Sequence, residues 1–167
     1  MTSPRSGWRF SGIELAGAAF GSVRPEGIAL TPAGRIAMTS GDEAVRQSII
    51  LLLTTIPGER VMRPDYGCPL HRLVFAPNDA TTAGLAIHYV RQALVRFEPR
   101  IDIVSLDAGP VRVRRDADDR SDEQDEDRDA ARDDDSKLVI SLSYRVRATN
   151  RAASLELELG LDGGGAG

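Results

Sequence analysis

The chain has 167 residues, a length that fits one domain and is sufficient to bury a core. It contains no run of about 18 or more apolar residues, so the sequence predicts no membrane-spanning helix. The first ten residues lack the apolar region of a secretory signal. Cys68 is the single cysteine, which excludes an internal disulfide and is typical of a protein that is made and folded in the cytoplasm.

The formal net charge of −4 conceals a strongly acidic segment. Residues 116–135 hold twelve acidic and three basic side chains, a local charge of −9, so the rest of the chain carries +5. A segment of this composition does not bury enough apolar surface to offset its ordering entropy, and we expect it to be a disordered loop. A body of charge +5 with few aromatic side chains does not indicate nucleic-acid binding.

Twenty of the 21 Lys and Arg side chains are arginine, and Lys137 is the only lysine. Codon usage in a GC-rich genome accounts for such a bias. The planar guanidinium group also suits fixed ion pairs between subunits better than an ammonium group does. Both interpretations of the arginine content stay open at this point.

The first forty residues are loop-like, and residues 1–26 are predicted to be an N-terminal extension. Short strands are predicted at residues 27–30 and 35–39, with a Thr-Pro-Ala-Gly turn at residues 31–34 between them. No internal repeat is evident along the chain.

A first helix is predicted over residues 42–56. Ser40 and Glu43 have the spacing of a capping box, in which each side chain satisfies the other residue's backbone N–H. The apolar residues behind them recur at helical spacing, at Val45, Ile49, Leu52 and Ile56, with Ile50 and Leu53 widening the stripe. Pro57 and the glycine after it end the helix.

Residues 59–77 hold three prolines and one glycine among apolar anchors, which indicates an ordered, irregular connector with a short strand at residues 60–63. A second helix follows the cap residues Asn78 and Asp79. Its apolar stripe is predicted at Ala83, Ile87, Val90, Leu94 and Phe97. Pro99 ends this helix, since the residue before a proline is disfavoured in helical geometry.

The last third of the chain is predicted to be β structure. Ile101, Ile103 and Ser105 alternate with Asp102, Val104 and Leu106, and a second run follows at residues 111–114. Beyond the acidic segment, one strand presents Leu138, Ile140, Leu142, Tyr144 and Val146 on one face, and a final strand alternates Leu155, Leu157 and Leu159 with Glu156 and Glu158. The acidic segment is therefore expected to be a hairpin loop, and residues 162–167 a flexible Gly-rich tail.

The sequence contains no constellation that predicts catalysis, cofactor binding or a metal site. Cys68 and His71 are three residues apart, but two ligands without further Cys or His nearby do not complete a zinc site. No Gly-rich phosphate loop, nucleophile elbow or HExxH motif is present. The acidic segment lacks the ligand spacing and the glycine of an EF-hand loop. We therefore predict no catalytic, cofactor-binding or metal-ligating residues.

Three ordered segments carry a resemblance to a known family. They are Thr-Ile-Pro-Gly-Glu-Arg at residues 55–60, Met-Arg-Pro-Asp-Tyr-Gly-Cys at residues 62–68, and the end of the second helix at residues 93–101 with its Glu-Pro-Arg triplet. Together they resemble the GPW-type baseplate wedge family, which includes the TssE subunit of type VI secretion and the sheath initiators of contractile phage tails and extracellular injection systems. The resemblance covers residues 27–160 apart from the acidic segment.

The resemblance implies an α+β fold in which two helices pack on a small, mostly antiparallel sheet, similar to the strand-exchanging part of contractile sheath subunits. It implies a wedge domain over residues 27–161, interrupted by the acidic insert at residues 116–135. It also implies a sixfold-symmetric baseplate of a phage tail-like particle, assembled in the bacterial cytoplasm. The expected partners are the sheath protein, other wedge subunits and the tube or spike hub, without nucleic acid or membrane. The strand with Leu155, Leu157 and Leu159 would be an exposed edge that pairs with the sheath.

The hallmark of the family is the Glu-Pro-Arg triplet, here Glu98, Pro99 and Arg100, and the resemblance implies that it contacts other wedge proteins. Glu98 is unusual on physical grounds too, because a negative charge at a helix C-terminus costs about 0.3–1 kcal/mol against the helix dipole. The alternatives are an intramolecular pair, for instance with Arg60, or plain exposure. An exposed pair of Arg100 would contribute only about 0–1 kcal/mol to folding.

Some members of this family are named lysozyme-like, so a peptidoglycan-degrading enzyme is the alternative function. A glycosidase needs two carboxyl groups roughly 5–9.5 Å apart, and Glu98 with Asp65 or Asp79 could be nominated. Sugar-stacking aromatic residues are missing, since Trp8, the only tryptophan, lies in the N-terminal extension. The sequence therefore favours a structural subunit that links the baseplate to the first sheath ring, and not an enzyme.

Overall fold

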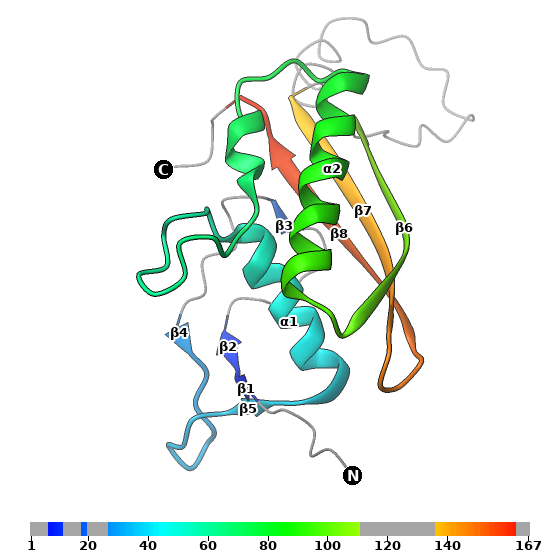
Figure 1. Cartoon of the computed structure of the whole chain (residues 1–167). Coiled ribbons are helices and arrows are strands. Elements are labelled where there is room, and N and C mark those ends of the chain that lie inside the picture. The colour runs from blue at the N-terminus through cyan, green and yellow to red at the C-terminus, as the bar shows by residue number, and fades with distance from the viewer. Residues whose placement is uncertain (1–6, 12–17, 20–26, 111–135, 163–167) are drawn as a thin grey trace, which may run out of the picture.

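The structure is a computed structural model that describes residues 7–11, 18–19, 27–110 and 136–162 (Figure 1). Its elements follow in the order β1 (Gly7–Trp8), β2 (Phe10–Ser11), β3 (Ala18–Ala19), β4 (Gly27–Ile28), β5 (Met38–Thr39), α1 (Gly41–Thr54), the 3₁₀ helix η1 (Pro69–Leu73), α2 (Ala80–Phe97), β6 (Ile101–Pro110), β7 (Lys137–Val146) and β8 (Ala152–Gly160). None of the helices in these ranges is long and apolar enough to cross a membrane.

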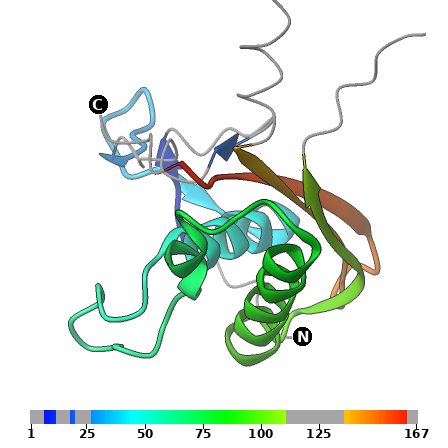
Figure 2. The same ribbon diagram turned by 90° about the horizontal axis from the view of Figure 1, so that it is seen from above.

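The main sheet has four strands in the order β3-β8-β7-β6. β6, β7 and β8 are antiparallel neighbours, whereas β3 joins the outer edge of β8 in parallel. Both helices lie on one face of this sheet (Figure 2), and α2 contacts β6 and β7. The predicted α+β fold, with two helices on a small and mostly antiparallel sheet, is confirmed.

The core fills the space between the helices and the inner face of the sheet. Side chains of β7 and β8 alternate between the core and the outer face, because successive residues of a strand point to opposite sides. The predicted inner faces are confirmed, with at most 4% exposure at Leu138, Ile140, Leu142, Tyr144, Val146, Leu155, Leu157 and Leu159. The helices supply the opposite wall, chiefly through Val45, Ile49, Ile50, Leu52, Leu53, Ala86, Val90 and Leu94.

α1 lies where the sequence predicts a helix, but its ends differ from the prediction. It begins at Gly41 and ends at Thr54, two residues before the predicted end. Ser40 is the N-cap residue with extended backbone, yet its side chain caps no N–H group. The Glu43 carboxylate forms an ion pair with Arg9 at 3.2 Å instead of turning back to the helix start. The predicted capping box is therefore wrong.

The connector after α1 is fixed by backbone contacts rather than by a strand. The Thr55 carbonyl accepts a hydrogen bond from the Cys68 N–H at 2.9 Å, which ties the end of α1 to the start of η1. Residues 60–63 form turns, with hydrogen bonds that span three residues, so the strand predicted there is wrong. The Arg63 N–H bonds to the Arg60 carbonyl and the Tyr66 N–H to the Arg63 carbonyl, so these backbone groups are used within the turns and not by a neighbouring strand.

α2 follows its prediction closely. Asp79 is the N-cap residue, and its carboxylate accepts a hydrogen bond from the Thr82 N–H at 2.8 Å, which lowers the pKa of Asp79. The helix ends at Phe97, and Glu98 is the C-cap residue directly before Pro99. The predicted cap and stop residues therefore set the two ends of this helix.

A β-bulge in β6 corrects the predicted alternation of this strand. Residues 103 and 105 pair with successive residues of β7, so Val104 is an extra residue and is 60% exposed. Because one residue is added, the alternation reverses beyond this point. Leu106, rather than Ser105, packs against the core.

The short N-terminal strands pair with the segment before α1. β1 pairs with β5 and β2 pairs with β4, in both cases antiparallel. The predicted turn at residues 31–34 is confirmed by a hydrogen bond from the Gly34 N–H to the Thr31 carbonyl at 2.9 Å. The Gln47 side chain also donates to the Trp8 carbonyl at 2.8 Å, which holds β1 beside α1. The domain boundary predicted at residue 26 stays a prediction.

β6 and β7 form a hairpin whose last described pair joins Pro110 and Leu138. The acidic insert at residues 116–135, the strand predicted at residues 111–114 and the tail after residue 162 lie outside the described residues.

The register of this hairpin leads to a prediction about the insert. Because the strand ends already lie side by side, we expect replacement of residues 116–135 by a short Gly-Asn turn to keep the melting temperature within about 4 °C of the parent. Circular dichroism melting would check this, with a Gly-Ser loop of the original length as control. A fall of more than about 10 °C in both variants would show that the insert packs on the body.

Candidate functional site

Glu98 is buried at the C-terminal end of α2, with only 2% of its surface exposed. Its two carboxylate oxygens accept hydrogen bonds from Arg100, at 2.5 Å from Nε and 2.7 Å from Nη2. The Ser48 hydroxyl on α1 is a further partner of the carboxylate. A buried carboxylate is tolerated here because a planar guanidinium binds both of its oxygens.

The electrostatics of this pair favour the charged forms. Burial raises the pKa of Glu98, but the hydrogen bonds from Arg100 and Ser48 outweigh it and leave the pKa below its usual value. The hydrogen bond to Glu98 in turn raises the pKa of Arg100. The structure therefore shows an intramolecular pair within the triplet. Plain exposure of Glu98 and its pairing with Arg60 are both wrong, whereas the contact of the triplet with other wedge proteins stays a prediction.

Arg100 retains an outward face, since 39% of its side chain is exposed. Pro99 is exposed beside it, and the Arg100 carbonyl accepts a hydrogen bond from the Arg147 N–H at 2.9 Å. This backbone hydrogen bond does not involve the outward N–H groups of the guanidinium. The triplet thus divides into a buried acid that fixes the guanidinium and a base that is presented at the surface.

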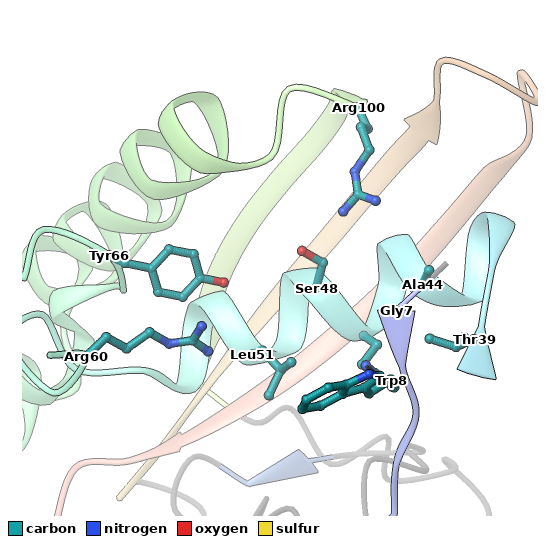
Figure 3. A pocket seen from close by; sticks show the side chains of 10 residues that line it. Gly7, Trp8, Thr39, Ala44, Ser48, Leu51, Arg60, Tyr66 and Arg100 are labelled. Carbon is teal, nitrogen blue, oxygen red and sulfur yellow. Dashed lines mark hydrogen bonds between the residues drawn. The ribbon is translucent and has the colours of Figure 1, made fainter. Parts of the chain in front are cut away.

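A cavity of about 340 Å³ lies beside Arg100 (Figure 3). One wall is a stripe of α1, and the others come from β1, β5, the connector and the start of β6. The lining residues are Gly7, Trp8, Thr39, Ala44, Gln47, Ser48, Leu51, Arg60, Tyr66 and Arg100. The cavity therefore brings together residues that are up to about ninety positions apart in the chain.

The connector loop places its side chains against α2. Arg60 lies over the Tyr66 ring at 4.3 Å from its centroid, and Tyr66 packs on Phe97 with the ring centroids 5.2 Å apart. Burial raises the pKa of Tyr66, so its hydroxyl stays protonated near neutral pH. Asp65 forms an ion pair with Arg96 at 3.1 Å. These contacts position Arg60 and Tyr66 at the cavity.

Neither carboxylate that the sequence nominated beside Glu98 is free to form a glycosidase pair with it. Asp79 caps the N-terminus of α2, whereas Glu98 lies at its C-terminus, roughly 27 Å away along 18 residues. Asp65 is exposed and paired with Arg96. Glu98 itself has a lowered pKa, whereas a general acid needs a raised one.

The strand β8 places Leu155, Leu157 and Leu159 in the core. Its outer edge is not wholly free, because β3 pairs with it in parallel and sets Ala18 opposite Leu157 and Ala19 opposite Glu158. The prediction of an exposed edge is corrected over these two residues. The use of β8 as a sheath-pairing strand stays a prediction.

Cys68 and His71, considered above as an incomplete zinc site, lie at the start of the 3₁₀ helix η1 and within it. Cys68 is fully buried, and burial raises its pKa to about 12, so that the thiolate is not formed near neutral pH. His71 lies in η1. In the described ranges, no group of three or more His, Cys, Asp or Glu side chains could hold a metal ion.

The sequence did not predict the residues that line the cavity beside Arg100 but lie far from the triplet in the chain. Ser48, Thr39 and Trp8 reach it from three elements, and no motif marks them. The spacing of Ala44, Ser48 and Leu51 along α1 is the one available signal, because it defines a second helix face opposite the apolar stripe.

Comparisons with known proteins agree with this geometry. Residues 39–151 match the model of the family described as baseplate wedge protein gp25. The baseplate wedge protein gp25 of Enterobacteria phage T4 is 28% identical over 76 residues, which are 46% of this chain and 58% of that protein. The chain therefore aligns with less than two thirds of the length of this relative.

Two solved structures are also similar. A protein from Geobacter sulfurreducens, named as a candidate tail lysozyme, is 36% identical with a TM-score of 0.58, over 77% of this chain and 98% of that one. A chain of the anti-feeding prophage baseplate aligns over 95% of this chain and 87% of its own length, with a TM-score of 0.52 and 19% identity, which is a likeness of fold. From the match over residues 39–151 and the Geobacter relative, the chain belongs to the family of the baseplate wedge protein gp25.

Proposed function

We propose that this chain is a structural wedge subunit that links the baseplate of a contractile, phage tail-like particle to its first sheath ring. The observation that carries the proposal is the geometry of the triplet. The buried Glu98 carboxylate fixes the Arg100 guanidinium, and the exposed side of this guanidinium is left for a neighbouring subunit. Its partners are other wedge subunits, the sheath protein and the tube or spike hub, in a sixfold-symmetric assembly built in the bacterial cytoplasm.

The triplet serves as the contact with other wedge subunits. Glu98 orients the guanidinium from inside, Pro99 fixes the backbone between the two charged residues, and Arg100 offers its remaining N–H groups to a partner's carboxylate. Such a preorganised guanidinium loses little conformational entropy on binding, which favours a specific contact.

The strand β8 serves as the template for the sheath. Leu155, Leu157 and Leu159 anchor it on the core, so its backbone edge is held in a fixed, extended form. Within the described residues, β3 covers this edge only opposite Leu157 and Glu158. A strand from a sheath subunit would pair with the rest of the edge or displace β3, because backbone donors and acceptors at a sheet edge recruit a further strand.

Electron microscopy of particles from a strain that lacks the gene tests this function. We expect baseplates and tubes without extended sheath, and recovery of sheathed particles when the parent gene is supplied in trans. Sheathed particles of normal length in the deletion strain would contradict the proposal.

Hydrogen exchange tests the pairing of β8. In the isolated protein we expect the β8 amides that face away from β7 to exchange faster than those bonded to β7, and to become protected in assembled particles. Full protection of residues 154–160 in the isolated protein would show that β8 is an interior strand without a template role.

We further propose that the protein has no peptidoglycan-degrading activity. The purified protein should leave the turbidity of a cell-wall suspension unchanged over hours, because Glu98 is buried, paired with Arg100 and has a lowered pKa, whereas a general acid needs a raised one. Hen egg-white lysozyme would serve as the positive control. Clearing that disappears in Glu98→Gln would overturn the structural role.

A further inference from the structure

The side chains that line the cavity beside Arg100 carry more hydrogen-bond donors than acceptors. The polar ends of Arg60 and Tyr66 point into it from one side and that of Arg100 from another, toward Ser48 on α1 (Figure 3). The carboxylate that pairs with these side chains is that of Glu98. Arg100 already binds both of its oxygens. Two guanidinium groups and one carboxylate leave this part of the cavity with a charge of +1.

Arg60 is the second guanidinium of the cavity. It lies over the face of Tyr66, and in the described part of the chain it forms no ion pair with a carboxylate. The N–H groups of a guanidinium that stacks on an aromatic ring point outward in the plane of the guanidinium. There they stay available to a hydrogen-bond acceptor. The stacking thus prepares Arg60 for an anionic ligand.

Thr39 marks the other end of the cavity. It is 2% exposed, and its hydroxyl has no hydrogen-bond partner among the described residues. Because this hydroxyl oxygen is itself closed to solvent, Thr39 forms the end wall of the cavity rather than a hydrogen-bonding group for an occupant. Its position beside Ala44, away from Arg60 and Tyr66, shows that the cavity is elongated along α1 (Figure 3).

The length of the cavity fits a short stretch of extended chain. The α1 stripe from Ala44 to Leu51 rises roughly 10 Å, which corresponds to about three residues of a strand. Leu51 and Trp8 add apolar surface between the charged end and Thr39. The groove therefore joins a charged end, formed by Arg60 and Arg100, to an apolar wall.

We propose that this cavity binds an extended segment of a neighbouring baseplate subunit and that an Asp or Glu side chain of that segment pairs with Arg60 and Arg100. The inference rests on the proposed function, because it names the chemistry of the wedge partner. The carboxylate neutralises the excess charge and takes the free N–H groups of the two guanidiniums. The apolar part of the segment lies against Trp8 and Leu51.

The isolated protein provides the first test, because Trp8 is the only tryptophan and lines the cavity. The probe is the peptide acetyl-Ala-Glu-Ala-amide, with acetyl-Ala-Gln-Ala-amide as its neutral match. We expect the glutamate peptide to shift the Trp8 indole N–H resonance saturably at millimolar concentration, and added salt to weaken the effect. The glutamine peptide should cause at least about tenfold less shift at the same concentration.

Two matched variants assign the binding to the cavity. Arg60→Gln should abolish the shift while its melting curve stays close to that of the parent, whereas Arg91→Gln, on the exposed surface of α2, should bind like the parent. Equal shifts with both peptides, or binding that survives Arg60→Gln, would overturn the inference. So would the absence of any saturable shift.

The chain's own acidic insert is the competing occupant. If residues 116–135 occupy the cavity, their replacement by a Gly-Asn turn moves the Trp8 resonance without any peptide, and that result would overturn the proposal. We expect no movement of the resonance in this variant.

Assembly in cells provides the second test. In the deletion strain, Arg60→Glu should support at least about tenfold fewer sheathed particles than the parent, since it opposes the partner's carboxylate, and Arg91→Glu should support normal numbers. Suppressors of Arg60→Glu should replace an Asp or Glu by Lys or Arg in one other baseplate subunit. Normal assembly with Arg60→Glu would contradict the inference, whereas sheathed particles without the subunit would contradict only the proposed function.

Discussion

Arg100→Ala is expected to lower the free energy of unfolding by about 2–4 kcal/mol, which corresponds to a fall in melting temperature of about 5–12 °C. The reason is the burial of its partner: removal of the guanidinium leaves the Glu98 carboxylate buried, with the Ser48 hydroxyl and the backbone N–H of residue 100 as hydrogen-bond partners but without a counter-ion in the pair. The loss lies toward the lower end for a broken buried pair because Arg100 is partly exposed and water can enter its place.

Arg147→Ala is the matched control for this change. Arg147 also binds one carboxylate through two nitrogens, at 2.9 and 2.7 Å from Asp102, but both side chains are more than half exposed. We expect a loss of at most about 1 kcal/mol, as for other surface pairs. Equal melting temperatures of Arg100→Ala and Arg147→Ala would contradict the buried character of the Glu98 pair.

The pH dependence follows from the direction of the Glu98 shift. A carboxyl with a lowered pKa stabilises the fold above its ordinary value, here 4.5, and this stabilisation is lost as the pH falls through the lowered pKa. The difference in stability between the parent and Arg100→Ala should therefore be largest near neutral pH and should shrink below about pH 4.5. Chemical denaturation at pH 7 and at pH 4 would measure it.

Arg100→Lys separates the role in folding from the role in assembly. Lysine keeps the charge beside Glu98 but cannot bind both oxygens and a partner at once, because it lacks the planar fork. We expect a smaller loss of stability than with alanine, together with a loss of sheathed particles nearly as severe as with alanine. Normal particles from Arg100→Ala would remove Arg100 from the interface.

Local signals predicted the helices and the inner strand faces, whereas pairings between distant residues were not predictable. Asp79 and Pro99 mark the ends of α2 because each acts on its own backbone or on the neighbouring turn. The bulge at Val104 is different, since the extra residue is defined only by the register with β7, a partner that follows the acidic insert.

The site shows the same division. The triplet was identified from the sequence, but the burial of Glu98 was not, because it depends on α1 lying across the end of α2 and supplying Ser48. The failed capping box has a similar cause: Arg9, from the N-terminal strands, takes the Glu43 carboxylate. Charged side chains form such pairs across the fold, and no periodicity in the sequence records them.

Among substitutions that add one methyl group to the connector, Gly67→Ala is expected to lower the free energy of unfolding most. The backbone of Gly67 has a φ of +131°, and a Cβ atom there would lie 2.4 Å from the Thr55 carbonyl oxygen and 3.0 Å from the Pro57 nitrogen. Backbone strain and overpacking each cost about 1–3 kcal/mol, so we expect a total loss of about 2–6 kcal/mol.

Gly58→Ala is the control that separates the two costs. Gly58 has a φ of +101°, but a Cβ atom there would meet nothing within 4 Å, so only the conformational cost of about 1–3 kcal/mol applies. Gly67 follows Tyr66 directly. A shift of the connector in Gly67→Ala should therefore also loosen the packing of Tyr66 on Phe97 and the stacking of Arg60 on Tyr66. We therefore expect Gly67→Ala to melt about 5–10 °C below Gly58→Ala and to lose the response of Trp8 to the glutamate peptide. If the two alanine variants melt together, the close approach of the connector to the end of α1 does not exist in solution.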